Sequence, residues 1–230
     1  MARLQGDFDL SRDQLAKSLE LTAQLGDRQG LAWCYHELGH LDQVTRNLGA
    51  ARDHFTEALA INRELEYPAG EAAAETNLAI VLHAMGDPAD TDAARRYLQD
   101  ALRIAGDHRA QAFALYQLGA LERDSGEHEA ARELLTQALA LYDEAGNRHG
   151  QADCHLNLAK ADRLIGNYET ANGHLTDALH IYVELGYRRR EAETYAELAA
   201  AAEAVGDETL SLMHRQRADT IYAQIGLNPI

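Results

Sequence analysis

A possible metal-binding motif is the first chemistry that the sequence offers. The segment from His36 to His40 reads His-Glu-Leu-Gly-His and so matches the pattern H-E-x-x-H. On a helix, two histidines four residues apart lie on one face and can share a zinc ion, while the glutamate activates a water molecule. Zinc-dependent hydrolysis by His36, Glu37 and His40 is therefore one candidate function.

The residues around this segment argue against a catalytic zinc site. Gln43 and Arg46 occupy the positions where the extended form of the motif has glycine and histidine. Glu57 and Glu64 are candidates for a third ligand, but both belong to the periodic pattern of the next helix. Short motifs of this kind often match by chance. We therefore expect no catalytic residue, no bound metal and no other cofactor.

The remaining histidines give no better site by spacing along the chain. His149 and His155 are six residues apart, as are His174 and His180, and residues at this spacing do not share a helical face well. The sequence has no glycine-rich phosphate loop, and nothing marks a nucleophile on a strained turn. These features favour a protein that is not an enzyme.

Composition narrows the class of protein further. A net charge of −16 repels phosphate backbones, so the chain is not expected to bind nucleic acid directly. No stretch approaches the roughly 20 apolar residues of a membrane span. Cys34 and Cys154 suggest no disulfide framework and indicate buried, reduced thiols in a cytoplasmic protein. Proline occurs only three times and alanine and leucine dominate, which predicts an all-α chain.

The elements that position these residues form an internal repeat. A leucine followed by glycine or alanine recurs at a constant interval without a slip, at Leu38-Gly39, Leu78-Ala79, Leu118-Gly119, Leu158-Ala159 and Leu198-Ala199. A second series, built on alanine and leucine, interleaves with the first. It slips by three residues after Pro88, and the short ending at Gly106 restores it. Each unit therefore predicts two helices, with glycines at the turns and Asn or Asp at the next helix start.

This framework of small residues resembles the tetratricopeptide repeat family over roughly residues 6–226. The usual unit has about 34 residues; the longer unit here is similar to those of kinesin light chains and of bacterial regulators. The family's tyrosine in the first helix is replaced, at successive repeats, by Asp42, Leu82, Glu122, Asp162 and Ala202.

The resemblance implies an all-α fold, a right-handed α-solenoid of about eleven antiparallel helices in a single domain spanning residues 1–230. It divides the chain into a half repeat at 6–27 and full repeats at about 28–67, 68–107, 108–147, 148–187 and 188–227.

The resemblance also implies a concave groove that binds a peptide. The positions expected to line it comprise aromatic anchors, side-chain amides in register from repeat to repeat, a basic cluster and the motif residues: Trp33, His36, Glu37, His40, Asn77, Phe113, Tyr116, Gln117, Arg123, Asn157, Lys160 and Arg163. Amides can pair with a peptide backbone at both donor and acceptor, and the basic cluster would hold an acidic side chain or a free carboxylate.

These features predict a protein- or peptide-binding scaffold or sensor. Similarity to actinobacterial-type regulators implies that it is a C-terminal part of a cytoplasmic bacterial regulator. The opening helix, expected from Asp7 to Leu25, has no preceding partner, so we expect possible self-association through that end of the chain. The alternative, a zinc-dependent hydrolase using His36, Glu37 and His40, belongs to a different class.

Overall fold

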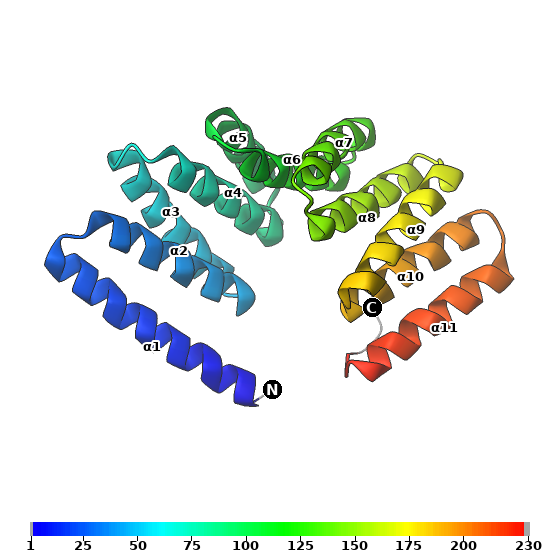
Figure 1. Ribbon diagram of the computed structural model, residues 1–230, viewed down its shortest axis with the longest axis horizontal. Coiled ribbons are helices and arrows are strands. Elements are labelled where there is room, and N and C mark those ends of the chain that lie inside the picture. The colour runs from blue at the N-terminus through cyan, green and yellow to red at the C-terminus, as the bar shows by residue number, and fades with distance from the viewer. Residues whose placement is uncertain (1, 228–230) are drawn as a thin grey trace. The chain divides into compact units, whose positions relative to one another are not determined.

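The computed structural model describes residues 2–227, with side chains from Asp7 onward, and that part of the chain contains helices and turns but no strand. The helices are α1 (Ala2–Leu25), α2 (Arg28–Val44), α3 (Leu48–Glu64), α4 (Pro68–Met85), α5 (Pro88–Ile104), α6 (His108–Asp124), α7 (His128–Glu144), α8 (Arg148–Leu164), α9 (Tyr168–Leu185), α10 (Arg188–Ala204) and α11 (Glu208–Gln224), as Figure 1 shows. The predicted all-helical fold of about eleven helices is confirmed. The first helix begins at Ala2 rather than at Asp7.

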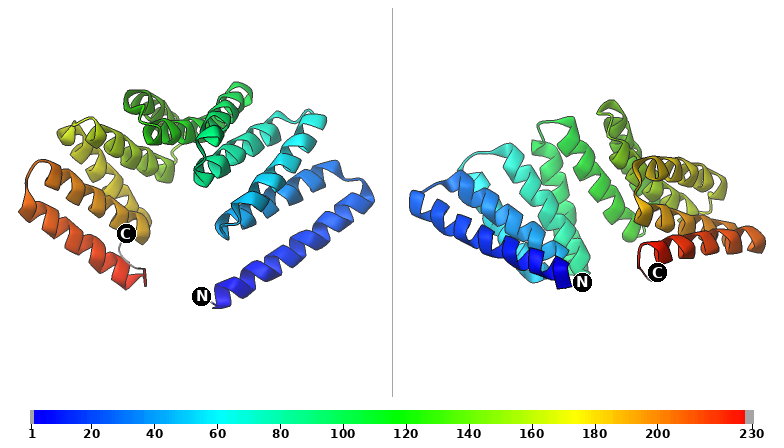
Figure 2. Two further views of the ribbon diagram at one scale, coloured as in Figure 1. Left: turned by 180° about the vertical axis from the view of Figure 1, so that it is seen from behind. Right: turned by 60° about the horizontal axis from the view of Figure 1, so that its bottom comes forward.

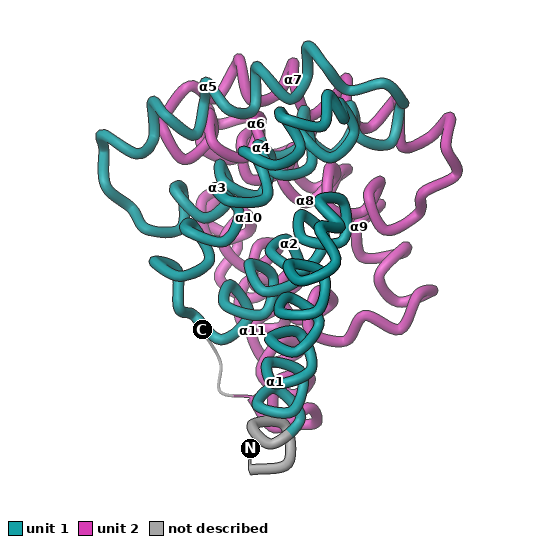
Figure 3. The backbone as a smooth tube through the Cα atoms, turned by 90° about the vertical axis from the view of Figure 1, so that its left-hand side faces the viewer, with its two compact units in different colours: residues 1–117 teal, residues 118–230 magenta. Residues whose placement is uncertain are grey.

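The chain forms two compact units, residues 1–117 and 118–230, and the boundary between them lies inside α6 (Figure 3). In the first unit, each helix from α1 to α5 packs against the next, and the same holds from α7 to α11 in the second unit. Consecutive helices within a unit run antiparallel (Figure 2). Each unit is therefore a row of helical hairpins in which side chains contact mainly the neighbouring helices.

The turns explain the regular spacing of the helices. A residue with positive φ ends nearly every helix, at Gly26, Arg46, Glu66, Gly86, Gly126, Gly146, Gly166, Gly186, Gly206 and Gly226. A left-handed residue after a helix stops it and lets its last carbonyls accept hydrogen bonds. For example, the amide of Asn147 donates to the carbonyl of Tyr142 at 2.9 Å. The first helices of successive repeats therefore begin at a constant interval along the chain.

The glycine that follows two of the framework leucines makes room for a large side chain of the next helix. A methyl group added at Gly39 would lie 2.6 Å from Cε1 of Phe55, and one added at Gly119 would lie 2.7 Å from Cγ of Leu135. Phe55 and Leu135 are completely buried. The glycines of the repeat thus allow α2 to approach α3, and α6 to approach α7, closely enough to bury these side chains.

The three-residue slip of the second sequence series falls within α5. This helix starts at Pro88 and ends at Ile104, in step with its counterparts, but its buried residues are Ala94, Leu98 and Ala101. In α3, the corresponding residues Ala51, Phe55 and Ala58 lie three positions closer to the helix start. The packed face of α5 is therefore shifted by about one turn, while the helix bounds stay unchanged.

Two buried carboxylates connect three consecutive helices each. Asp42 of α2 contacts Arg12 of α1 at 2.6 Å and His54 of α3 at 2.7 Å. The same residue types recur at the equivalent positions of a later repeat: Asp162 of α8 contacts Arg132 of α7 at 2.6 Å and lies 3.8 Å from His174 of α9. A fully buried carboxylate requires charged partners, so these positions, where the family has tyrosine, carry an ionic connection instead.

Candidate functional site

The histidines of the H-E-x-x-H segment lie on α2 and are used within the fold. Nε2 of His36 is 2.9 Å from the amide nitrogen of Asn77 on α4. The rings of His36 and His40 meet edge to face at 4.6 Å between centroids, and both contact the ring of Phe55. Burial, followed by the charge of His40, lowers the pKa of His36. Among the described side chains, three metal-ligating groups converge at another place and not here, so these contacts give no support to hydrolysis.

The predicted aromatic anchors are accessible but do not form one cluster. Trp33 is 56% exposed and Phe113 is 39% exposed, whereas Tyr116 is half-buried. Trp33 and His36 line a pocket of about 500 Å³ near the starts of α2 and α4, together with Tyr67, Gly30 and Gly70. Phe113 is not among the residues that line this pocket.

Tyr67 is a residue of this pocket that the groove positions expected from the sequence do not include. It precedes Pro68 at the start of α4 and is 45% exposed. The expected groove positions all lie inside the first helices, whereas Tyr67 lies in the turn before one. An aromatic residue directly before the helix-starting proline was the available signal.

The predicted amides are largely committed to contacts between helices. Asn77 is 6% exposed and meets His36, as described above. Asn157 is 8% exposed; its carbonyl oxygen accepts from Arg123 of α6, and its amide donates to the carbonyl of Asp153 at 2.9 Å. A buried amide without partners would cost free energy, so Asn77 and Asn157 serve the packing of first helices. Gln117 is half-buried.

The predicted basic cluster is compensated by carboxylates from the same unit. Lys160 and Arg163 of α8 share Glu197 of α10, at 3.6 Å and 3.3 Å. Arg123 pairs with Asp124 at 2.6 Å. Glu37 is on α2 beside His36, with its Oε1 atom 3.7 Å from Nδ1 of His36. Sequence spacing along α8 did not reveal Glu197, because it comes from another helix.

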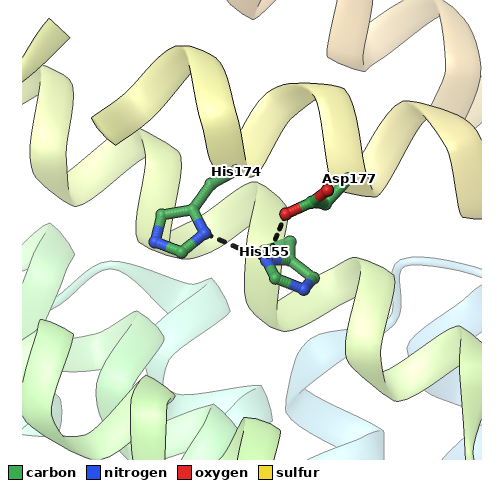
Figure 4. Close-up of side chains that lie close together, drawn as sticks. All are labelled: His155, His174 and Asp177. Atoms are coloured by element: carbon green, nitrogen blue, oxygen red, sulfur yellow. Dashed lines mark hydrogen bonds and ion pairs between the residues drawn. The ribbon is translucent and has the colours of Figure 1, made fainter. Parts of the chain in front are cut away.

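A different cluster of histidine and aspartate lies on the hairpin of α8 and α9. His155 of α8 meets His174 and Asp177 of α9 (Figure 4). Spacing within a single helix cannot detect this cluster, because His155 and His174 belong to different helices. Pairing positions across each predicted hairpin would have revealed it.

The described part of the chain holds no helix with the length and apolar character needed to cross a bilayer.

The family model for the tetratricopeptide repeat matches residues 1–64 and 70–144. No curated protein matches the sequence.

Several solved structures share the fold across nearly the whole chain. BtubC (BKLC) from P. vanneervenii is 20% identical, with a TM-score of 0.80, and the match covers 97% of this chain and 94% of that one. PilW, a type IV pilus biogenesis factor, is 16% identical with a TM-score of 0.72 over 98% and 90% of the two chains. The apo form of RapI is 13% identical with a TM-score of 0.68 over 97% of each chain. Identities this low show the fold alone.

Proposed function

Because the chain belongs to the tetratricopeptide repeat family, we propose that it binds a peptide segment of another protein at the pocket formed by Trp33, His36 and Tyr67. The observation that carries this proposal is the pairing of two exposed aromatic side chains beside one hollow. Monomeric proteins seldom expose large aromatics together without use, and aromatic side chains dominate binding energy at interfaces.

The chemistry of the pocket favours an apolar or aromatic anchor flanked by basic residues. Its lining includes the aromatic side chains of Trp33 and Tyr67 and the small apolar residues Ala32, Ala69 and Ala73. Its polar lining residues include Asp27 and the buried Asn62. The net charge of −16 attracts a cationic segment over long range. This replaces the acidic peptide expected from sequence, because Glu197 and Asp124 already compensate the basic cluster.

Trp33 is the only tryptophan of the chain, so its fluorescence reports directly on this pocket. The test begins with peptides selected from a random library on the full chain. Peptides bound at the pocket are expected to shift the Trp33 emission. Calorimetry is expected to show that Trp33→Ala weakens binding about thirtyfold or more, since hot-spot truncations cost about 2 kcal/mol and upward.

The matched control is Val183→Ala, which removes a similarly exposed apolar side chain from α9 in the second unit. It is expected to bind as the wild type does. Equal affinities for wild type and Trp33→Ala, with no change in emission, would place the binding surface elsewhere.

The wider context proposed is a C-terminal sensing or scaffolding part of a cytoplasmic bacterial regulator. The support is the sequence similarity to the longer repeats of such regulators, together with two free, buried cysteines, Cys34 and Cys154. Reduced thiols of this kind are usual in a reducing compartment.

Self-association through α1 is a second mode of binding that one observation favours. Leu10, Leu21 and Leu25 are all more than half exposed and lie along one face of α1 by helical spacing. Light scattering over a range of concentrations is expected to show a dimer that Leu21→Glu with Leu25→Glu converts to a monomer. A monomer at every concentration would remove this mode and leave the pocket unaffected.

A further inference from the structure

Three side chains that can ligate a metal ion converge on the hairpin of α8 and α9 (Figure 4). Nδ1 of His155 lies 3.0 Å from Nδ1 of His174 and 4.0 Å from Oδ2 of Asp177. The three candidate ligand atoms lie within 4.8 Å of one another. Across residues 7–227, no other three histidine, cysteine, aspartate or glutamate side chains meet this condition.

We propose that His155, His174 and Asp177 bind a divalent transition-metal ion of the zinc type. Two nitrogens bound to one tetrahedral zinc ion at the usual bond length are about 3.3 Å apart, close to the separation of the two imidazoles here. Two imidazoles and a carboxylate form a donor set that zinc prefers. Asp177 is largely exposed, so its side chain is free to rotate toward the ion. The fourth position is left for water or for a group from another molecule.

A second carboxylate lies behind the ring of His174, beyond hydrogen-bond distance. Oδ2 of the fully buried Asp162 lies 3.8 Å from Nε2 of His174, the ring nitrogen opposite the one that faces His155. Metal-binding histidines commonly have a carboxylate behind the ring, because it fixes the tautomer and strengthens the ligand. Burial lowers the pKa of both His155 and His174, with a further contribution from the charge of His174 on His155, and so favours the neutral form that binds metals.

The chain itself contains a comparison that separates ligand geometry from packing. In the hairpin of α2 and α3, the equivalent positions hold Tyr35, His54 and Glu57, and Asp42 again stands beside the histidine. The histidine next to the buried aspartate thus recurs in both hairpins as part of the packing between helices, which explains His174. It does not explain His155, because a tyrosine serves the packing at that position in the earlier hairpin.

The ring distances agree with this distinction. The centroids of Tyr35 and His54 are 6.1 Å apart, and those of Tyr195 and His214, at the same positions in the hairpin of α10 and α11, are 5.9 Å apart. The rings of His155 and His174 are closer, at 5.2 Å, and two nitrogens face each other.

The test is a zinc titration of the full chain, stripped of metal, in competition with a chromophoric chelator at neutral pH. One tight equivalent of Zn²⁺ is expected for the wild type. His155→Tyr introduces the residue that the chain already has at Tyr35 and Tyr195, so the hairpin is expected to keep its fold, as circular dichroism will check. This variant is expected to bind zinc at least about tenfold more weakly, and Asp177→Asn to weaken it less.

The matched control is the double variant His36→Gln with His40→Gln, which removes the other close pair of histidines. It is expected to bind one tight equivalent of Zn²⁺, as the wild type does. Co²⁺ added to the wild type is expected to give the visible absorption of a low-coordinate ion with nitrogen ligands, and His155→Tyr is expected to lose it. Three results would overturn the proposal: no tight equivalent in the wild type, unchanged binding by His155→Tyr, or loss of binding in the control.

Discussion

At the scale of single residues, Glu75 of α4 shows how burial and charge compete. Its side chain is almost fully buried, and Oε1 lies 2.6 Å from Nη2 of Arg63. Burial nevertheless raises the pKa of Glu75 to about 7, because removal of the carboxylate from water outweighs the attraction of Arg63. The carboxyl group is therefore partly protonated near neutral pH in the folded protein.

This pKa predicts a pH-dependent effect of Glu75→Gln. A carboxyl whose pKa is raised from 4.5 to about 7 on folding stabilises the fold at low pH, and that contribution is lost as pH rises through this window. The glutamine stays neutral throughout. Relative to the wild type, the variant is therefore expected to gain up to about 3 kcal/mol in free energy of unfolding between pH 4.5 and pH 8.

Urea unfolding of both proteins at several pH values measures this difference. Titrations of groups that do not interact with Glu75 cancel when the two proteins are compared at each pH. A difference that does not change with pH would show that folding does not shift the pKa of Glu75.

Single residues also mark how far the sequence can be interpreted. The framework pairs of leucine with glycine or alanine predicted the helices well, because they depend on contacts between adjacent helices that recur in every repeat. The amides Asn77 and Asn157 have the spacing of groove positions, but their hydrogen bonds are made to other residues of the protein. Helical periodicity places a side chain on a face without revealing what lies opposite, which is also why the pair of His155 and His174 was missed.

At the scale of the helices, the turn after α5 differs from the others. Every other described turn between helices contains a residue with positive φ, whereas Gly106 does not adopt one. The capping residue Ala105 is extended, with φ −61° and ψ 116°. α5 ends in step with its counterparts, but the backbone path from α5 to α6 differs from the path in the other turns.

This difference predicts opposite effects of the same substitution at two glycines. Gly146 has a φ of +64°, so Gly146→Ala is expected to destabilise the fold by about 1 kcal/mol. An added methyl group at Gly106 meets no atom within 4 Å and no positive φ. Gly106→Ala is therefore expected to stabilise by about 0.4–1 kcal/mol, since alanine restricts the unfolded chain. Denaturant melts of the two variants compare these effects, and equal signs would contradict the backbone described for these turns.

At the scale of the whole molecule, the division into two units predicts that a destabilising substitution affects mainly the unit that contains it. Gly39→Ala would force the new methyl group against Phe55, at an expected cost of about 1–3 kcal/mol. Phe55 packs in a cluster of α3 and α4 that includes Leu59, Leu78 and Val81. Because helices contact mainly their neighbours, amide hydrogen exchange is expected to quicken from α2 to α4 and stay unchanged from α8 to α11.

Gly49→Ala is the matched control, since nothing lies within 4 Å of the added methyl group on α3. It is expected to leave exchange unchanged or to slow it. Faster exchange throughout both units in Gly39→Ala would mean that the chain opens as one cooperative body.

The shifted face of α5 has a consequence for how such a chain tolerates insertions and deletions. Three residues gained before the packed face and three lost after it cancel within one helix, so the hairpins on either side keep their frame. A repeat protein can thus drift in sequence length by compensated pairs of changes without misaligning the later helices. In α5 the two changes leave the start and the end of the helix in step with those of α3, while its packed face is shifted.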